Sequence, residues 1–292
     1  PVPGDKSISH RSVMMAALAK GPTRINNLLT GADCLATIAA FKEMGVEIVE
    51  ADAQKHVFDI KGTGLSGLNQ PKTEIYLANS GTSMRLLLGI LAGQDFEAVL
   101  TGDESLCKRP MKRVTHPLLM MGAHIEGADD ANFAPLKIRG GRLRSIEYKS
   151  PVASAQVKSC IMLASLYADA TTRFSEPFKS RDHTERIFKL FGAEVAVEGN
   201  DILVTKTERL KTVGELTIPA DISSAAFFIA LALLLPRAEI TIKSCGINPT
   251  RTGFLNVLSS SGAGIGIINK RGEDYEPYAD IFVRHSELSG FV

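Results

Sequence analysis

Apolar and polar positions follow the same order four times along the chain. Each copy has an amphipathic stretch at helical spacing, then a glycine, then a stretch in which apolar and polar residues alternate. The glycines stand in the phrases MGVEI, MGAHI, FGAEV and SGAGI, 77, 70 and 70 residues apart: Gly45, Gly122, Gly192 and Gly262. A glycine between the two patterns is typical of a helix end that admits a strand. The pattern predicts a repeated unit of about 70 residues.

The same elements are expected inside each unit. At EIYLANSGTSMRLLL, residues 74–88, a short strand leads into a helix whose apolar residues share one face: Met84, Leu87, Leu88 and Leu91. A strand follows at EAVLTG, and a polar loop, a second helix, the glycine and a hairpin complete the unit. The order predicts an α/β protein made of repeated β-α-β-α-β-β units. The alternative is a doubly wound sheet whose elements look alike without being repeats.

Small polar residues stand where the first helix of each unit is expected to begin. The four junctions are PGDKSISHR, ANSGTSMR, VASAQVKS and PADISSAA. Hydroxyl and amide side chains are good helix N-caps, and the first N–H groups of a helix have no partner within it. If the units pack about a pseudo-symmetry axis, these helix starts gather at one end, where their dipoles and N–H groups favour an anion.

The charge distribution supports a local anion site. Lys and Arg number 33 against 32 Asp and Glu, so the net charge of +1 gives no reason to expect nucleic acid or a membrane surface as a partner. Cations nevertheless concentrate at the junctions and in the loops before the second helices: Lys6, Arg11, Arg85, Lys108, Arg109, Lys112, Arg113, Lys158 and Arg181. This placement predicts a ligand that carries phosphate or carboxylate groups.

Other chemistries have little support in the sequence. The four cysteines are far apart and form no C-x-x-C pair, which argues against disulfides and zinc and favours a reducing compartment such as the cytoplasm. His10, His116 and His183 lack a carboxylate or cysteine at ligand spacing, so no metal and no cofactor are predicted. Cys107, in a basic loop, leaves a nucleophilic thiol as an alternative. The longest apolar run, within residues 225–235, has the length of a core helix.

Six motifs between residue 3 and residue 228 resemble the signatures of one family, in the order in which that family carries them. They are PGDKSISHR, LANSGTSMR, LTGDESLCKRPMKRV, SAQVKSC, KSRDHTE and PADISSAAFF. On these motifs the chain is similar to 5-enolpyruvylshikimate-3-phosphate (EPSP) synthases of the enolpyruvyl transferase family, the target of glyphosate. SAQVKSC and KSRDHTE look like the branch with glyphosate-tolerant bacterial enzymes, whereas Gly81 is the glycine of sensitive ones.

The resemblance implies the inside-out α/β barrel of enolpyruvyl transferases, in which two domains of three β-α-β-α-β-β units face each other across a cleft. Four of the six expected units are present. Residues 5–219 are expected to form the N-terminal domain, on the shikimate 3-phosphate side, and residues 1–4 and 220–292 a partial second domain. The chain is then expected to cross between the domains near Pro3–Gly4 and near Pro219–Ala220.

The resemblance also assigns residues to the two substrates of the family. Those matched to shikimate 3-phosphate are Lys6, Ser7, Arg11, Ser154, Gln156 and Arg181. Those matched to phosphoenolpyruvate are Lys6, Asn79, Gly81, Thr82, Arg109 and Gln156. Lys6 belongs to both sets and is the one residue assigned a catalytic role. Asp221 is expected to have a structural role, and His10 to lie behind the site or at the surface.

The activity that the resemblance implies is that of a transferase in the shikimate pathway of aromatic amino acid biosynthesis. The enolpyruvyl group moves from phosphoenolpyruvate to the 5-hydroxyl of shikimate 3-phosphate, and phosphate is released. Both ends of the chain, at Pro1 and at residues 290–292, fall inside a unit, so we expect a fragment truncated at its C-terminal end.

In the family, the acid and the base come from the second domain beyond the end of this sequence. The fragment alone is therefore expected to be inactive, and we expect the protein to be a cytoplasmic monomer. Two alternatives remain open. One is UDP-N-acetylglucosamine enolpyruvyl transferase, which shares the fold and uses a loop cysteine, and the other is a non-catalytic anion-binding module.

Overall fold

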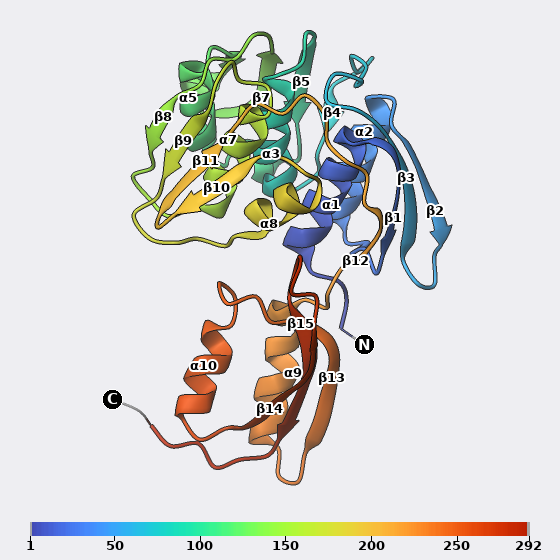
Figure 1. The fold of residues 1–292 in the computed structure, drawn as a ribbon, viewed down its shortest axis with the longest axis vertical. Coiled ribbons are helices and arrows are strands. Elements are labelled where there is room, and N and C mark those ends of the chain that lie inside the picture. The colour runs from blue at the N-terminus through green and yellow to red at the C-terminus, as the bar shows by residue number, and fades with distance from the viewer. Residues whose placement is uncertain (1, 291–292) are drawn as a thin grey trace.

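The computed structural model describes residues 2–290, which form a larger and a smaller lobe joined at one end (Figure 1). Buried apolar residues from Ile8 to Ile218 form one core cluster, and those from Ala220 to Val283 form a second. The strand ends expected at Pro1 and at Phe291–Val292 lie outside the described residues.

The elements follow one another in four similar sets. The first set is α1 (Lys6–Leu18), β1 (Lys20–Asn26), α2 (Ala32–Glu43), β2 (Glu47–Asp52) and β3 (Val57–Thr63). The second is β4 (Ile75–Tyr76), α3 (Gly81–Leu91), β5 (Glu97–Thr101), α4 (Glu104–Cys107), α5 (Lys112–Met120), β6 (His124–Gly127), α6 (Ala128–Ala131) and β7 (Phe133–Arg139). The third is β8 (Glu147–Lys149), α7 (Ala155–Ser165), β9 (Thr172–Ser175), α8 (His183–Leu190), β10 (Val195–Glu198) and β11 (Asp201–Val204). The fourth is β12 (Gly214–Thr217), α9 (Ile222–Leu234), β13 (Glu239–Gly246), α10 (Gly253–Ser260), β14 (Gly264–Arg271) and β15 (Tyr278–Arg284).

Three four-stranded sheets of the larger lobe have the same pairing. In the sheet β4-β5-β7-β6 the first pair is parallel and the others are antiparallel. The sheet β8-β9-β11-β10 repeats this order, and so does β12-β1-β3-β2, because β12 pairs parallel with β1. The strand that follows the third unit therefore closes the ring onto the first. The predicted architecture of repeated β-α-β-α-β-β units is confirmed.

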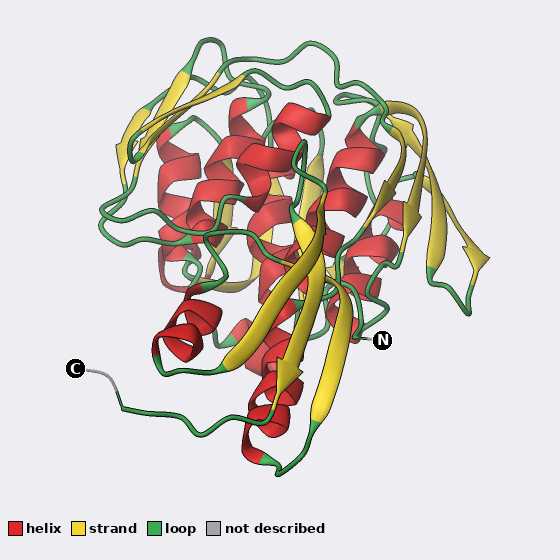
Figure 2. Ribbon diagram, turned by 60° about the horizontal axis from the view of Figure 1, so that its bottom comes forward, coloured by secondary structure: helices red, strands yellow, loops and turns green. Residues whose placement is uncertain are grey.

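The first helices of the three units lie at the centre of the larger lobe. Figure 2 shows its helices gathered between sheets that lie on the outside. Helix α3 is buried at every position except Thr82, and α7 at every position except Gln156. The sequence predicted one apolar face for α3, but this helix is enclosed on all sides and has no face exposed to water. Both exceptions stand at the second position of their helix.

The four repeat glycines end the second helix of each unit. Gly45, Gly122, Gly192 and Gly262 have φ angles of 86°, 99°, 75° and 84°. In the first unit the N–H of Gly45 donates to the Lys42 carbonyl and the N–H of Val46 to the Phe41 carbonyl, and the other three units repeat both bonds. A Cβ is strained at these angles, which explains why a glycine marks each repeat.

The fourth unit differs because its first strand remains in the larger lobe. Strand β12 pairs with β1, and the smaller lobe has the three-stranded sheet β13-β15-β14. The chain crosses between the lobes twice, and the two crossings pair with each other. The N–H of Asp5 donates to the Pro219 carbonyl at 2.8 Å, and the N–H of Asp221 donates to the Pro3 carbonyl at 2.9 Å. Helix α1 begins at this junction (Figure 1).

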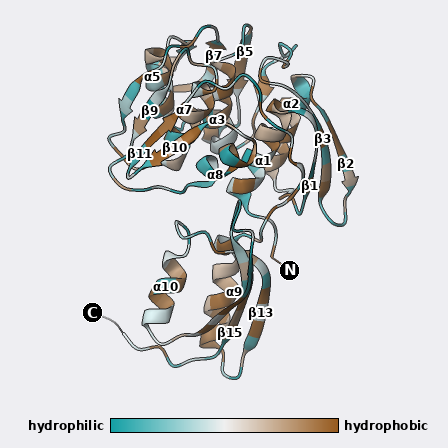
Figure 3. Cartoon of the chain, in the orientation of Figure 1, coloured by the Kyte–Doolittle hydropathy of each residue, from teal (hydrophilic) through white to brown (hydrophobic). Residues whose placement is uncertain are grey.

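Helix α9 is the counterpart of α3 in the smaller lobe, but one of its faces is open. Most of its residues are hydrophobic, as the brown segments along α9 in Figure 3 show. Ile222, Ile229 and Leu233 are buried, whereas Phe227 and Leu234 are 79% and 69% exposed. An exposed apolar face of this extent marks a surface for another part of a protein.

Candidate anion-binding site

Side chains cap the first helix of every unit, as the sequence predicted. Ser80 and Ser154 accept from the N–H groups of Ser83 and Val157 at 3.2 and 3.4 Å. Asp5 and Asp221 accept from Ile8 and Ser223, both at 2.9 Å. Two of the caps are therefore carboxylates, where hydroxyl and amide groups were expected. Within residues 2–290, the first two N–H groups of α1 and α7 and the second of α3 have no partner and can bind a ligand, whereas the N–H of Gly81 donates to the Asn79 carbonyl at 3.0 Å.

Arg11 lies one turn into α1 and is only 5% exposed. Its Nη1 donates to the Ser7 carbonyl at 2.9 Å, its Nε to Thr184 Oγ1 at 2.7 Å and its Nη2 to Ser159 Oγ at 2.6 Å. Arg181 reaches the same place from the loop before α8, where its Nη1 donates to Ser7 Oγ at 3.3 Å. We call Ser7, Arg11 and Arg181 the Arg11 centre. The structure thus brings together three of the residues expected to bind shikimate 3-phosphate.

A second group of cations lies at the start of α3. Arg109 donates to Asn79 Oδ1, and Asn79 Nδ2 donates to Asp103 Oδ2 at 2.7 Å. Arg85 is 7% exposed, and its guanidinium contacts the carbonyl oxygens of Gly81 and Pro110. We call Asn79, Gly81, Arg85 and Arg109 the Arg85 centre. It contains three of the residues assigned to phosphoenolpyruvate, together with Arg85, which the sequence placed only among the local cations.

Gly81 lies between the two guanidinium groups of this centre. A Cβ at this position would stand 3.0 Å from Arg85 Nη1 and 3.1 Å from Arg109 Nη1. Both atoms are ends of flexible side chains, so a methyl group would displace the cations and leave the backbone in place. The glycine therefore allows both guanidinium groups to lie close to the first turn of α3.

Gln156 bonds to the Arg85 centre and lines the same cavity as Arg181 of the Arg11 centre. Its Oε1 accepts from Arg85 Nη1 at 2.8 Å, and its Nε2 donates to Thr82 Oγ1 at 3.0 Å. The same residue lines a cavity of about 510 Å³ together with Ala153, Ser154, Ala155, Lys179, Ser180, Arg181 and Thr250. We call this the inner cavity. Since Thr250 belongs to the smaller lobe, the cavity lies between the lobes.

The arginines of both centres are held near one another against their mutual repulsion. Burial and then the charge of Arg181 lower the pKa of Arg11 to about 10. Burial and then the charges of Arg113 and Arg109 lower the pKa of Arg85 to about 10. Within residues 2–290, the hydrogen-bond partners of Arg11 and Arg85 are neutral oxygen atoms. Each centre would therefore gain from an anion.

Lys6 lies apart from both centres. Its ammonium pairs with Asp33 near the start of α2, and the side chain is 47% exposed. It stands at the first position of α1, next to Ser7, so a half-exposed lysine can turn toward the centres without moving the helix.

Two side chains singled out from the sequence are buried inside the protein. Lys158, expected among the cations that face a ligand, is fully buried and pairs with Glu176 and Glu185. His10 is not at the surface, because its side chain is enclosed between α1 and α2 and its Nδ1 lies 2.7 Å from Thr37 Oγ1. Both therefore act, at most, through other residues.

The sequence did not identify several residues that hold the site. Ser159 and Thr184 lie 148 and 173 residues from Arg11, and their hydroxyl groups fix its guanidinium. Arg251 of the smaller lobe lies 3.4 Å from both capping carboxylates, Asp5 and Asp221, which fits the structural role expected for Asp221. Ser159 stands inside the motif SAQVKSC and Thr184 inside KSRDHTE, so the motifs mark both residues. No local sequence pattern, however, shows that their hydroxyl groups bond to Arg11.

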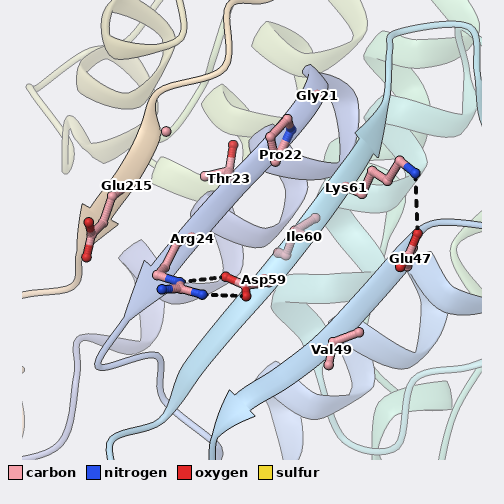
Figure 4. A pocket seen from close by; sticks show the side chains of 11 residues that line it. Gly21, Pro22, Thr23, Arg24, Glu47, Val49, Asp59, Ile60, Lys61 and Glu215 are labelled. Carbon is pink, nitrogen blue, oxygen red and sulfur yellow. Dashed lines mark hydrogen bonds and ion pairs between the residues drawn. The ribbon is translucent and has the colours of Figure 1, made fainter.

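A larger concavity, about 720 Å³, lies on the exposed face of the sheet β12-β1-β3-β2 (Figure 4). We call it the outer concavity. Four of its charged side chains form two ion pairs: Arg24 contacts both oxygens of Asp59 at 2.7 Å, and Lys61 lies 3.7 Å from Glu47. Glu215 instead accepts from Asn26 Nδ2 at 2.6 Å. None of the residues expected to bind substrate lines it.

Other kinds of site find no support in the part of the chain that the structure describes. Residues 2–290 hold no group of three or more His, Cys, Asp and Glu side chains that could bind a metal. None of the helices in this range has the length and apolar composition needed to cross a bilayer. The four cysteines are free thiols, and Cys107 Sγ donates to the Gly102 carbonyl at 3.5 Å.

Comparisons with known proteins agree with one another. A family model described as EPSP synthase (3-phosphoshikimate 1-carboxyvinyltransferase) matches residues 1–290. Proteins named 3-phosphoshikimate 1-carboxyvinyltransferase from Geobacillus kaustophilus and Pelobacter propionicus are 54% and 53% identical to the chain. These matches cover 98% and 99% of the chain, and the chain spans 66% of the length of each relative. A solved structure of EPSP synthase from Acinetobacter baumannii has a TM-score of 0.93 and 46% identity, over 99% of this chain and 66% of that one.

Proposed function

The chain belongs to the EPSP synthase family, and we propose that it is the part of a 3-phosphoshikimate 1-carboxyvinyltransferase that binds shikimate 3-phosphate and one side of phosphoenolpyruvate. In the reaction proposed for the whole protein, the 5-oxygen of shikimate 3-phosphate bonds to C2 of phosphoenolpyruvate while C3 gains a proton. The C2–O bond to phosphate then breaks as a proton leaves C3 again, and the hydroxyl proton is released to the base. Aromatic amino acid biosynthesis uses this product.

The proposal rests on two arginine centres and on one amide, that of Gln156, which bonds to one centre and lines the same cavity as Arg181 of the other. The phosphate of shikimate 3-phosphate would lie at the Arg11 centre, where Ser154 and the free N–H groups of α7 add neutral donors. Phosphoenolpyruvate would lie at the Arg85 centre, against the first turn of α3. Gln156 contacts Arg85 and Thr82 and also lines the inner cavity, so its amide would lie between the two substrates.

Lys6 is the residue that we propose takes part in the chemistry. Its present partner is the Asp33 carboxylate. A substrate with two or more negative charges would compete for the ammonium, because a cation is favoured where charge develops in the reaction. Lys6 would then stabilise the phosphate that leaves phosphoenolpyruvate.

We propose that this polypeptide binds substrate but does not turn over. The carboxylates close to the two centres have other partners: Asp103 accepts from Asn79, and Asp5 pairs with Arg251. The matched relatives are longer than the chain, and the resemblance puts the acid and the base in their remaining part. Residues 5–219 and residues 1–4 with 220–292 would be separate domains, and the exposed face of α9 would be where further units of the second domain pack.

The names of the relatives favour shikimate 3-phosphate over the UDP-sugar that Cys107 left open. The two arginine centres favour a substrate-binding part of an enzyme over a non-catalytic module. We further propose a cytoplasmic monomer, which fits the four free thiols and the near-zero net charge.

Two measurements on this polypeptide test the proposal. Isothermal calorimetry with shikimate 3-phosphate should give saturable binding at one site. An assay of phosphate release with both substrates should give no turnover above background, whereas the longer relative from Geobacillus kaustophilus is the positive control. Absence of any shikimate 3-phosphate binding would contradict the binding role, and turnover close to that of the control would contradict the need for the remaining part.

A further inference from the structure

Lys158 cannot bind a ligand, although its place in the motif SAQVKSC suggested that it would. Its side chain is fully buried. Its Nζ lies 2.9 Å from Glu176 Oε1, 2.7 Å from Glu185 Oε1 and 3.4 Å from the Ser180 carbonyl oxygen. The three ammonium protons therefore have three acceptors, all of them within the protein.

One of these acceptors holds the loop that carries Arg181. Glu176 Oε1 accepts from the N–H of Ser180 at 2.9 Å, and Glu176 Oε2 accepts from Ser180 Oγ at 2.6 Å. A single carboxylate thus fixes both the backbone and the side chain of the residue just before Arg181. The glutamate side chain is 1% exposed, so these bonds are sheltered from water.

We propose that Lys158 is a positioning residue for anion binding: it holds the Glu176 carboxylate, which fixes Ser180 and so presents Arg181 to the inner cavity beside Ser7. This role rests on the proposed function, since it concerns the same site. Lys158 stands on α7, whose first turn also lines that cavity through Ser154 and Gln156. One helix thereby supplies donors at its start and fixes the cation opposite.

The charge of Lys158 is what keeps Glu176 in this role. A buried carboxylate without a cation either takes up a proton or turns toward water, and both changes weaken its bonds to Ser180. Glu185 has a different place in the cluster. It bonds to Lys158 from α8, and the bonds to Ser180 come from Glu176, so a change at Glu185 leaves those bonds in place.

The matched variants follow from this difference. Lys158→Met keeps an unbranched side chain of similar length and removes the cation. Glu185→Gln is the control, because it changes the other carboxylate of Lys158 and leaves the Glu176–Ser180 bonds intact. Each variant is examined by amide hydrogen exchange at Ser180 without ligand, and by calorimetry with shikimate 3-phosphate.

In Lys158→Met, Ser180 should exchange about tenfold faster or more, while β9 and the middle of α8 keep their protection. Affinity for shikimate 3-phosphate should fall about tenfold, since a charge-assisted hydrogen bond to the ligand is no longer preorganised. Glu185→Gln should change neither quantity more than about twofold, because Lys158 still pairs with Glu176 and Glu176 still bonds to Ser180. In the double variant with Arg181→Ala, the loss should equal that of Arg181→Ala alone, because both changes remove the same contact.

A purely structural role would give a different result. The melting temperature of Lys158→Met would fall, but Ser180 exchange and the affinity of the folded protein would match wild type, or the two losses would add; either outcome overturns the proposal. If the wild-type chain binds no shikimate 3-phosphate, the proposed function fails, and Ser180 exchange still decides whether Lys158 holds the loop.

Lys158→Met leaves two carboxylates without their cation and risks misfolding. Glu176→Gln then takes its place, since Lys158 keeps Glu185 as a partner. The neutral amide makes weaker bonds to Ser180 than the carboxylate does, so exchange and affinity should change in the same direction by about threefold. Wild-type values in this variant would also overturn the proposal.

Discussion

The outer concavity and the inner cavity use their charges in opposite ways. The outer concavity is larger, about 720 Å³ against about 510 Å³, yet its arginine and lysine are paired across the strands with Asp59 and Glu47 (Figure 4). Next to the inner cavity, the partners of Arg11 and Arg85 are neutral oxygens. The difference teaches that unused charge and hydrogen-bonding capacity, more than volume, mark the anion site.

The largest expected effect is loss of Arg181. Arg181→Ala removes a guanidinium whose partner is the Ser7 hydroxyl, so its charge is available to a phosphate. Affinity for shikimate 3-phosphate should fall by about 1.5–3 kcal/mol, or roughly tenfold to a hundredfold. Arg24→Ala is the matched control from the outer concavity, where Asp59 already holds the guanidinium, and calorimetry should detect no change. Equal losses in the two variants would erase the distinction between the cavities.

The second-largest expected effect is a loss of folding stability at low pH, which we attribute to buried His10 near Arg11 and not to the exposed ion pairs of the outer concavity. Burial, and then the charges of Arg11 and Lys6, lower the pKa of His10 from 6.5 to about 3, so the folded protein keeps this ring neutral. The unfolded chain protonates it near its ordinary pKa. The contribution of His10 to the free energy of unfolding is therefore fully present above pH 6.5, and it is lost as the pH falls from 6.5 to about 3. Between pH 7.5 and pH 5.5 the loss should be about 1.4 kcal/mol.

Urea unfolding at the two pH values measures this difference. His10→Gln should remove most of the pH dependence that the histidine causes, and the exposed His124→Gln should leave it as in wild type. A wild-type slope in His10→Gln would mean that other groups cause the loss. The exposed ion pairs of the outer concavity should contribute little in either case.

The smallest expected effect is that of one methyl group at the Arg85 centre. Gly81→Ala places a Cβ against the guanidinium groups of Arg85 and Arg109, which can yield, so unfolding free energy should change little. Affinity for phosphoenolpyruvate, measured with shikimate 3-phosphate present, should fall about threefold to tenfold, because the displaced cations lose part of one hydrogen bond. Affinity for shikimate 3-phosphate alone is the internal control. If it falls equally, the change is not confined to the Arg85 centre.

The sequence predicted those features that depend on neighbouring residues. Glycines such as Gly45 follow from a backbone angle, and caps such as Ser154 follow from the free N–H groups of one helix turn. The repeat then implied that the helix starts gather, because equivalent positions in equivalent units lie at equivalent places. The motifs carried the residues of both centres.

Whether a given cation pairs with a carboxylate inside the protein could not be predicted in the same way. Lys158 and Arg11 both follow a helix start, yet Lys158 pairs with Glu176 and Glu185, while the hydrogen-bond partners of Arg11 within residues 2–290 are neutral oxygens. Which cation is neutralised depends on how α7 packs against the loop before α8, and no spacing along the chain specifies that contact. For the same reason the sequence left open whether His10 lies behind the site or at the surface, since its burial depends on α2.

Hydrogen exchange with and without shikimate 3-phosphate tests the central claim most directly, because it shows where the ligand binds. The account predicts slower amide exchange in the first turns of α1 and α7 and in residues 179–182, and unchanged exchange in β1 and β3. Protection along β1 and β3, with none at the helix starts, would place the ligand in the outer concavity and contradict the account.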